Sequence, residues 1–269
     1  MGQYGVKIAD MWERIHGERP LLHHITNFVV MNDTANVTLH AGALPVMAHA
    51  KEEVAEMVSA AGALVLNPGT LTPQWVEAML VAGHRANELS IPIVLDPVGA
   101  GATNLRTESN LRLLRELEIA IVRGNSGEIG ALGGLGGEVK GVEATKEVEN
   151  PVEVAKAFAK QFRVTVAITG KRDIISDGER VMAVDNGDAM LKTITGTGCM
   201  ATTMVAAFAA VERDYYLAAT GGLVCFGLAA ERAAPQARGP ASFKVALLDE
   251  IYNLNREIIM EGQKAQALS

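Results

Sequence analysis

The sequence has few cysteines, no apolar run at its beginning and no apolar stretch long enough to cross a membrane. Cys199 and Cys225 are the two cysteines in 269 residues, too few for a disulfide framework. The longest apolar stretch, 215–230, is interrupted by glycines and falls short of the roughly 20 residues that a spanning helix needs. Charged residues in the segment 7–14 stand where a signal peptide would be apolar. We therefore expect a cytoplasmic protein with no membrane partner.

Basic residues are also too few and too scattered for a nucleic-acid surface. The 24 Lys and Arg stand against 31 Asp and Glu, which gives a formal net charge of −7 at pH 7. A protein that binds a phosphate backbone or an anionic membrane usually gathers its basic residues in a patch or stripe, and this sequence shows none. We expect small molecules, or copies of the chain itself, as partners.

Apolar residues make up 49% of the sequence, enough for a sizeable core, and one domain over 1–269 is the simplest arrangement. Short apolar runs alternate with helical patterns, which predicts an α/β fold with a mostly parallel sheet and helices on both faces. The turn Asp177-Gly178 predicts an antiparallel edge hairpin. The run 22–29 does not have the pattern of a clean strand. The predicted strands are 63–66, 91–95, 119–122, 164–168, 173–176 and 180–184, and the predicted helices are 6–16, one beginning at 51, 73–87, 108–117, 151–162, one ending at 210, 215–233 and 242–260.

The most informative stretch is Thr195-Gly196-Thr197-Gly198-Cys199-Met200, which leads directly into an apolar helix. Glycine lets the backbone approach a ligand closely, and the unpaired N–H groups and positive end of a helix attract an anion. We predict an anion hole here, with a phosphoryl group in transfer as its ligand. Cys199 is expected in the first helical turn, where the helix end would lower the pKa of its thiol.

Two other interpretations of this stretch have to be weighed. Gly-x-Gly is common in tight turns, and a cysteine near a helix start is often a small buried apolar residue. A dinucleotide-binding fingerprint would need a second strand with an acidic residue after the helix. Residues 212–214 lead instead into another apolar helix, so we set the dinucleotide interpretation aside.

Polar residues follow the predicted strands. The carboxyl ends of parallel strands form one rim at which ligands bind, so these side chains should converge. Two carboxylates, Asp96 and Glu128, are a plausible seat for Mg²⁺, which is usually held partly through water. For Asn67 alone, an ordinary turn residue is the better interpretation. The residues at or just beyond strand ends are Asn67, Asp96, Arg123 with Asn125, and Thr169.

Three further features carry weaker signals. His23 and His24 are adjacent, so on an extended chain they point to opposite faces and cannot easily share a metal ion. Met47 lies in an irregular stretch, where methionine can form an adaptable wall for a flat ring. The glycine-rich region 130–141 is expected to be a mobile loop, and it lacks the Lys-Ser/Thr ending of a Walker loop.

Four motifs together resemble the ribokinase-like superfamily, and within it the hydroxyethylthiazole kinase family. They are Asp96-Pro97-Val98-Gly99-Ala100, Arg123-Gly124-Asn125-Ser126-Gly127-Glu128, Thr169-Gly170 and Gly196-Thr197-Gly198-Cys199. The resemblance runs through nearly the whole chain. The segments Asn27-Phe28-Val29 and Pro45-Val46-Met47-Ala48 are similar to the thiazole kinases in particular, as is Cys199, where most ribokinase relatives carry Asp.

The resemblance implies in-line phosphoryl transfer from ATP to the hydroxyl of 4-methyl-5-(2-hydroxyethyl)thiazole, a salvage step toward thiamine. It also implies Mg²⁺ and a homotrimer with active sites between subunits. By position, Arg123 and Thr169 would contact the nucleotide, while Asp96 and Glu128 would belong to the Mg²⁺ shell. Positioning and charge neutralisation carry most of the barrier reduction in such reactions.

On the acceptor side, the resemblance implies that Met47, Gly196 and Asn27 contact the thiazole and that Cys199 accepts the hydroxyl proton as the base. The backbone amides of the anion hole would come from Gly196, Thr197, Gly198 and Cys199. The alternative functions are a hydroxymethylpyrimidine kinase, an ATP-dependent dehydratase that repairs hydrated nicotinamide cofactors, and a regulatory protein that binds a nucleotide without turnover.

Overall fold

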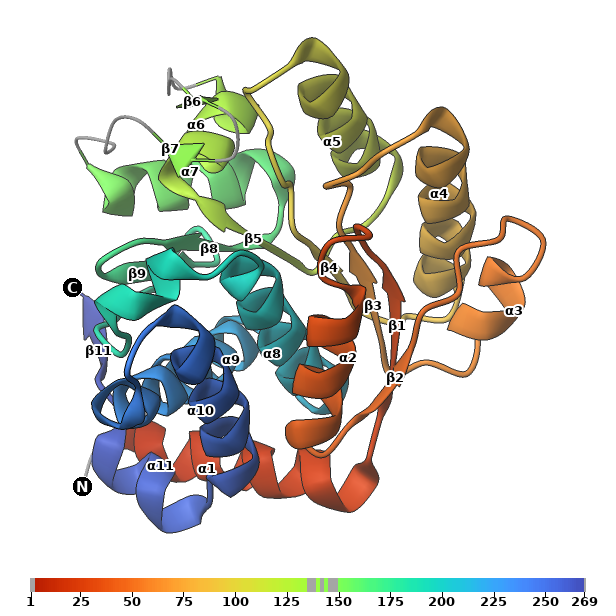
Figure 1. Ribbon diagram of the computed structural model, residues 1–269. Helices are drawn as coiled ribbons and strands as arrows, with labels where there is room; N and C mark the ends of the chain where they lie inside the picture. Colours follow the sequence, from red (N-terminus) through yellow and green to blue (C-terminus); the bar gives the residue numbers. More distant parts are fainter. Residues whose placement is uncertain (1–2, 135–138, 141–142, 145–149, 269) are drawn as a thin grey trace.

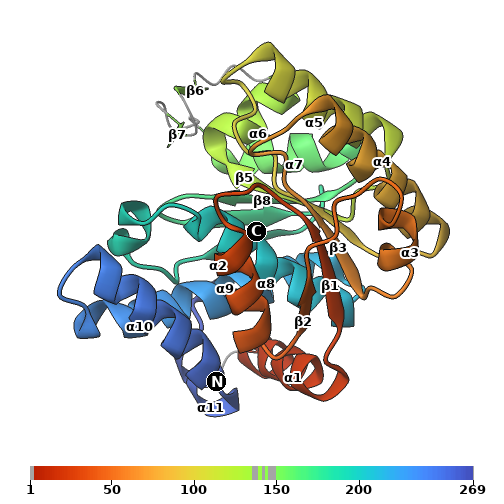
Figure 2. The ribbon, with the colours of Figure 1, turned by 45° about the vertical axis from the view of Figure 1, so that its right-hand side comes forward.

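The computed structural model describes residues 3–134, 139–140, 143–144 and 150–268. These residues form a nine-stranded sheet between two layers of helices (Figures 1 and 2). The order across the sheet is β11-β10-β9-β8-β5-β4-β3-β1-β2, and a separate antiparallel pair consists of β6 (Val139–Lys140) and β7 (Glu143–Ala144). The strands of the large sheet are β1 (Leu21–Ile25), β2 (Leu44–Val46), β3 (Ala63–Leu66), β4 (Ile93–Leu95), β5 (Ile121–Asn125), β8 (Thr165–Thr169), β9 (Asp173–Ser176), β10 (Val181–Val184) and β11 (Ala265–Leu268).

The two faces of the sheet bury different helices. Successive strand residues point to opposite faces, so Leu64 packs in one core cluster and Val65 in the other. One face is covered by α3 (Val54–Val58), α4 (Pro73–Glu88), α5 (Asn104–Glu116), α6 (Ser126–Gly133) and α7 (Pro151–Phe162). The other is covered by α1 (Gln3–Glu18), α2 (Met31–His40), α8 (Thr197–Val211), α9 (Tyr215–Ala233), α10 (Pro240–Asn253) and α11 (Arg256–Gly262).

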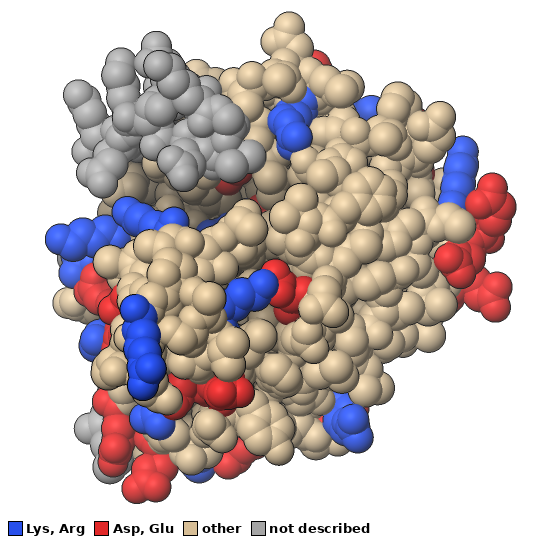
Figure 3. Space-filling view, viewed as in Figure 1, with Lys and Arg blue, Asp and Glu red and all other residues tan. Residues whose placement is uncertain are grey.

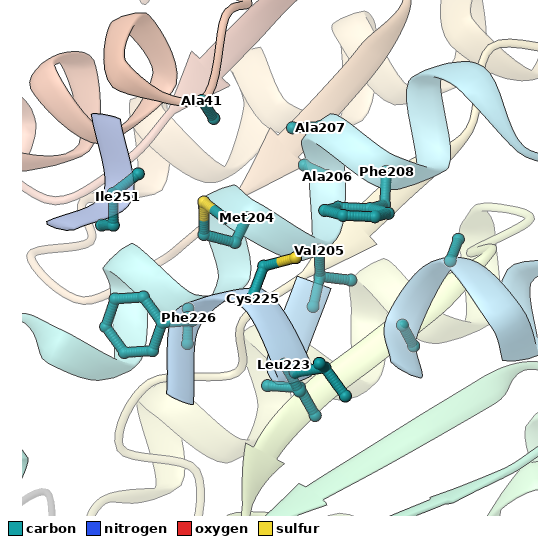
Figure 4. Packing of buried hydrophobic residues seen from close by; sticks show 14 of the residues in the cluster. Ala41, Met204, Val205, Ala206, Ala207, Phe208, Leu223, Cys225, Phe226 and Ile251 are labelled. Atoms are coloured by element: carbon teal, nitrogen blue, oxygen red, sulfur yellow. The ribbon is translucent and has the colours of Figure 1, made fainter. Parts of the chain in front are cut away.

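Helices α8 and α9 form the centre of the second face, where Met204, Phe208 and Cys225 pack together (Figure 4). A Cβ on Gly222 would lie 2.6 Å from the Val205 Cα, so only glycine allows the two backbones to approach this closely. The segment Tyr215–Gln236 is long and apolar enough to span a membrane, but 78% of its apolar window is buried inside the protein. Burial of that extent is typical of a core helix.

The predicted fold class is confirmed. Strands β2, β1, β3, β4, β5 and β8 run parallel, and β9, β10 and β11 add antiparallel edge strands beyond β8. Helices α4 and α7 begin after the predicted cap residues. The hydroxyl of Thr72, which precedes Pro73, accepts a hydrogen bond from the N–H of Trp75, and the side chain of Asn150 accepts one from the N–H of Glu153. One domain over 1–269 stays a prediction.

Four local predictions were wrong. Residues 21–25 form strand β1, which shows no apolar alternation because both of its faces are buried. Strand β5 continues through Asn125, so Arg123 lies within a strand rather than after it. The predicted helix 242–260 is two helices, since the side chain of Asn255 caps a new start, and strand β11 then follows. Residues 130–133 belong to α6; the predicted loop beyond 134 lies largely outside the described residues.

Candidate active site

Polar side chains from five strands meet at the carboxyl-end rim of the parallel sheet. The backbone ladder continues past the strands: the N–H of Asn67 donates to Ile25 O at 3.0 Å, and the N–H of Asp96 donates to Leu66 O at 2.9 Å. Because the ladder keeps these residues in register, side chains separated by dozens of residues in the sequence become neighbours. The rim carries Asn27, Asn67, Asp96, Arg123 and Thr169. The strand pattern predicted the last four, whereas Asn27 follows β1, which was not predicted as a strand.

The stretch predicted to form an anion hole, 195–200, contains the N-terminus of α8 and lies at this rim. Gly196 is the N-cap residue with φ of 87°, a conformation that favours glycine, and a Cβ there would lie 2.6 Å from Val30 Cγ1. Thr197 Oγ1 donates to Leu191 O at 2.9 Å and ties this turn to the short helix Ala189–Thr193. A Cβ on Gly198 would lie 2.7 Å from Arg123 Nη1, so the guanidinium packs directly against the first turn of the helix.

Arg123 has more hydrogen-bond donors than it uses within the described part of the chain. Its Nη2 donates to Thr169 Oγ1 at 2.6 Å, and Thr169 Oγ1 lies 3.3 Å from Gly124 O. Its buried Nε has no hydrogen-bond partner among the described residues. A cation with an unused donor beside a helix N-terminus is suited to a phosphate group, because the arginine and the helix amides attract the same anion.

A cavity of about 640 Å³ opens beside Arg123 and Gly198. Its volume is within the range of ligand pockets, its mouth is charged, and α9 supplies an apolar wall from Leu223 and Phe226. A larger hollow of about 1140 Å³ lies at the other end of the sheet, beside Pro92, Ala120 and Thr165, where the strands begin. Arg123 and the first residues of α8, Thr197 and Gly198, line the smaller cavity, which makes it the candidate ligand site.

The carboxylates of Asp96 and Glu128 are both buried close to Arg123. The Glu128 oxygens accept from the N–H groups of Gly99 and Asn125, each at 2.9 Å. Burial, followed by the charge of Asp96, raises the pKa of Glu128 to about 7, and burial also raises the pKa of Asp96 while Arg123 opposes that change. A bound cation would stabilise the ionised forms of these two buried carboxylates.

The donor set fits Mg²⁺, which prefers hard oxygen ligands and keeps several waters. The described residues contain no group of three or more His, Cys, Asp or Glu side chains that could hold a metal ion. Asp96 and Glu128 would therefore supply only part of a metal shell, and phosphate oxygens and water would complete it. His23 and His24 have separate partners, Ala48 O at 2.8 Å and Thr38 Oγ1 at 3.1 Å.

Cys199 lies in the first turn of α8 as predicted, but the expected lowering of its pKa is wrong. Asn67 Nδ2 is 3.2 Å and Asn27 Nδ2 is 3.6 Å from its sulfur. Burial, followed by the negative charge of Asp96, raises the pKa of the thiol to about 12. The helix end cannot offset these two effects, so the thiol is protonated at neutral pH.

Three residues of the site were missed or discounted from the sequence. Besides forming its turn, Asn67 donates a hydrogen bond to Asp96 Oδ2, and Thr202 Oγ1 donates to the same oxygen at 3.0 Å. Asp173 lines the cavity, and burial raises the pKa of its carboxyl to about 6. The signal for Asn67 was its place directly after a strand, the same signal that identified Asp96.

Met47 is half-buried directly after β2, at the same end of the sheet as Asn27.

A mostly parallel sheet with helices on both faces, and with an arginine packed against a glycine-rich helix N-terminus at its carboxyl-end rim, defines the class of ribokinase-like α/β folds. A ribokinase-like superfamily protein from Enterococcus faecalis V583 has the same fold, with a TM-score of 0.68, 12% identity and coverage of 92% of this chain and 95% of that one. The particular family follows from closer relatives.

The chain belongs to the hydroxyethylthiazole kinase family, whose model matches residues 12–257. It is 67% identical over 263 residues to a hydroxyethylthiazole kinase of Chloroflexus aggregans, covering 98% of this chain and 95% of the relative. It is 68% identical over 258 residues to one of Roseiflexus sp. (strain RS-1), covering 96% of each. The structure of a hydroxyethylthiazole kinase protein from Pyrococcus horikoshii OT3 matches with a TM-score of 0.89 and 43% identity, covering 98% of this chain and 99% of that one.

Proposed function

We propose that this kinase transfers the γ-phosphoryl group of ATP to the hydroxyl of 4-methyl-5-(2-hydroxyethyl)thiazole, in thiamine salvage in the cytoplasm. The observation that carries the proposal is Arg123 packed against the Gly198 turn, with a nucleotide-sized cavity opening beside them. The names of relatives at 67% and 68% identity support the acceptor.

In the proposed arrangement the nucleotide lies in the cavity and its phosphates reach the anion hole. Arg123 and the amides of Gly196, Thr197, Gly198 and Cys199 neutralise charge on the transferring group, and Thr169 orients the guanidinium. On the other side, Asn27, Met47 and Gly196 form the wall for the thiazole. The hydroxyl is then held between Cys199 and the anion hole, where its proton leaves late in the reaction.

Asp96 and Glu128 are the residues that would hold Mg²⁺, and the ion would neutralise negative charge on the phosphates. We expect Asp96→Asn to raise the Mg²⁺ concentration for half-maximal rate by about 10-fold or more, because it removes one of two buried charges from the seat. A titration of rate against Mg²⁺ at saturating ATP measures this. An unchanged Mg²⁺ requirement in both Asp96→Asn and Glu128→Gln would show that the metal seat lies elsewhere.

Cys199 is the proposed proton acceptor, but its raised pKa makes it a poor base until its own proton moves toward the neighbouring Asp96. We expect Cys199→Ala to lower kcat by about 10- to 100-fold while nucleotide affinity is largely retained. Cys199→Asp should match or exceed the wild type, since a carboxylate facing the Asn67 and Asn27 amides can accept a proton directly. Single-turnover rates measure both, and an Asp variant slower than the Ala variant would rule out the base assignment.

A homotrimer with active sites between subunits is also proposed. Apolar side chains lie on the surface next to Asn27, where Phe28 is 60% and Val29 62% exposed, and near the start of β2, where Leu39 is 49% and Leu44 37% exposed. The face in Figure 3 has charges at its edges and one acidic and basic pair near its centre, and a broad area without charge extends from that pair over β2 and α4. Such a patch is typical of an interface. Light scattering that gives three times 28.5 kDa would support a trimer, and a monomer mass would contradict it.

The function is tested by a mass-resolved assay with ATP, Mg²⁺ and a mixture of hydroxyethylthiazole and hydroxymethylpyrimidine. A thiazole phosphate as sole phosphorylated product is expected. A pyrimidine phosphate would assign the chain's activity to the alternative kinase. Phosphate release without a phosphorylated product, measured with hydrated nicotinamide cofactor present, would indicate the repair dehydratase, and nucleotide binding without turnover would indicate a regulatory protein.

A further inference from the structure

Asn67 is a fully satisfied buried amide at the centre of the rim, with 2% of its surface exposed. Its Nδ2 donates to Asp96 Oδ2 at 2.9 Å and to Cys199 Sγ at 3.2 Å. Its Oδ1 accepts from Asn27 Nδ2 at 2.9 Å and from the N–H of Gly69 at 3.1 Å. An asparagine amide has two N–H donors and two acceptor lone pairs, so these four contacts use its whole capacity.

A turn-forming role explains only one of the four contacts. An Asx turn needs the bond between Oδ1 and the N–H two residues on, which here is the bond to Gly69. The other three contacts reach Asn27 after β1, Asp96 after β4 and Cys199 in α8, and none of them is required for the turn. The turn is itself fitted to Asn27: a Cβ on Gly69 would lie 2.9 Å from Asn27 Nδ2, and Phe28 N donates to Thr70 Oγ1 at 3.1 Å.

The contact with Asp96 orients a charged group. Asp96 Oδ2 accepts from both Asn67 Nδ2 and Thr202 Oγ1, at 2.9 Å and 3.0 Å. Two neutral donors on one oxygen favour the ionised carboxylate and leave its second oxygen for other partners. Since the same Asn67 amide also holds Asn27 and Cys199, the carboxylate and the acceptor wall cannot move independently of each other.

We propose that Asn67 is a positioning residue that holds Asp96, Asn27 and Cys199 in a single arrangement, so that the acceptor hydroxyl and the carboxylate side of the site are aligned together. The proposal rests on the proposed function, because it needs an acceptor alcohol bound between Asn27 and Cys199. It assigns to Asn67 a catalytic contribution through other residues and no contact with either substrate.

The decisive variant is Asn67→Asp. Aspartate has the same shape and forms the same Asx turn, but it replaces both Nδ2 donors with an acceptor that faces Asp96. We expect kcat to fall by about 100-fold and the KM for the thiazole alcohol to rise several-fold, because misplacement of reacting groups by about 1 Å costs rates of this order. Calorimetric affinity for ADP at saturating Mg²⁺ should stay within about twofold, since Arg123 and Thr169 are untouched.

Two further variants separate the contributions. Thr202→Val removes the other donor to Asp96 without touching Asn27, so it should lower kcat by about 10-fold and leave the KM for the thiazole alcohol unchanged. Asn110→Leu is the matched control: Asn110 is also a fully buried asparagine, but it bonds to Arg106 O within α5. Its kinetics should equal those of the wild type at a temperature where both are folded.

An Asn67→Asp enzyme with wild-type kcat and KM would overturn the proposal and leave Asn67 as a turn residue. If Asn67→Asp does not fold, Asn67→Ser, which keeps a hydroxyl able to bond the turn, takes its place with the same expectations.

A wild-type enzyme that leaves the thiazole alcohol unphosphorylated contradicts the proposed function alone. The Mg²⁺ concentration for half-maximal ADP binding then tests the positioning: it should rise about 10-fold in Asn67→Leu, and no rise would overturn the proposal.

Discussion

Replacing Arg123 with Met should lower kcat/KM for ATP by on the order of 10³-fold, the largest catalytic effect that we expect from a single substitution. Methionine keeps much of the side-chain volume but removes the cation that packs against the Gly198 turn and the donor that bonds Thr169. In the proposed arrangement the transferring phosphoryl group then loses its arginine and keeps the helix amides and Mg²⁺. Initial-rate kinetics with varied ATP measure the change.

The same substitution should also shift the pH dependence of the rate. The charge of Arg123 lowers the pKa values of Asp96, Glu128 and Asp173, against burial, which raises all three. Without that charge, the pKa of Glu128 should rise further above about 7, so a higher pH is needed to ionise it. At limiting Mg²⁺, the acidic limb of the rate profile should therefore move to higher pH in Arg123→Met.

Arg112→Met is the control for this experiment, because Arg112 pairs with Glu77 and Glu116 on the exposed surface of α5, far from the rim. Exposed ion pairs contribute little to stability, and the control should have wild-type kinetics. An Arg123→Met enzyme within about tenfold of the wild type would show that the phosphates are bound elsewhere.

Acid should destabilise the protein through His24, and His24→Leu should remove most of that sensitivity. Burial, followed by the neighbouring His23 and His49, lowers the pKa of His24 to about 3. The unfolded chain binds the proton near pH 6.5, while the folded protein does not bind it until about pH 3. The free energy of unfolding that depends on neutral His24 is therefore fully present above pH 6.5. It is lost as the pH falls toward 3, by roughly 5 kcal/mol in all.

The comparison has to be made as a difference between variants, because buried carboxyls act in the opposite direction. The raised pKa values of Glu128, about 7, and Asp173, about 6, mean that their protonated forms suit the fold. Their contribution to the free energy of unfolding is present at low pH and is lost as the pH rises through these pKa values. Urea unfolding of wild type and His24→Leu from pH 7.5 to 4.5 cancels this shared contribution, and the difference in unfolding free energy isolates His24.

Leucine at position 24 loses the bond to Thr38 Oγ1, but that hydroxyl still donates to Thr34 O at 2.8 Å. His84→Ala serves as the control, since His84 is exposed on α4. Curves of unfolding free energy against pH that run parallel in wild type and His24→Leu would contradict the prediction.

Much of the architecture could be read from local patterns. The apolar runs 63–66 and 164–168 became β3 and β8, and the caps at Thr72 and Asn150 began α4 and α7. These features depend on neighbouring residues, so the sequence contains their causes. The motif residues at the rim were also predictable, because the carboxyl ends of parallel strands necessarily share one edge.

The sequence by itself therefore determined most of the elements, the rim and the family, while β1, β11 and the break before α11 became clear only in the structure. Only the tertiary structure decided the properties of the groups at that rim. A helix N-terminus next to Cys199 predicts a lowered thiol pKa, whereas burial beside Asp96 raises it to about 12. Asn67 has the sequence signal of an ordinary turn, and its three other contacts come from distant residues. Burial and neighbouring charge depend on which strands lie side by side, and no local pattern contains that information.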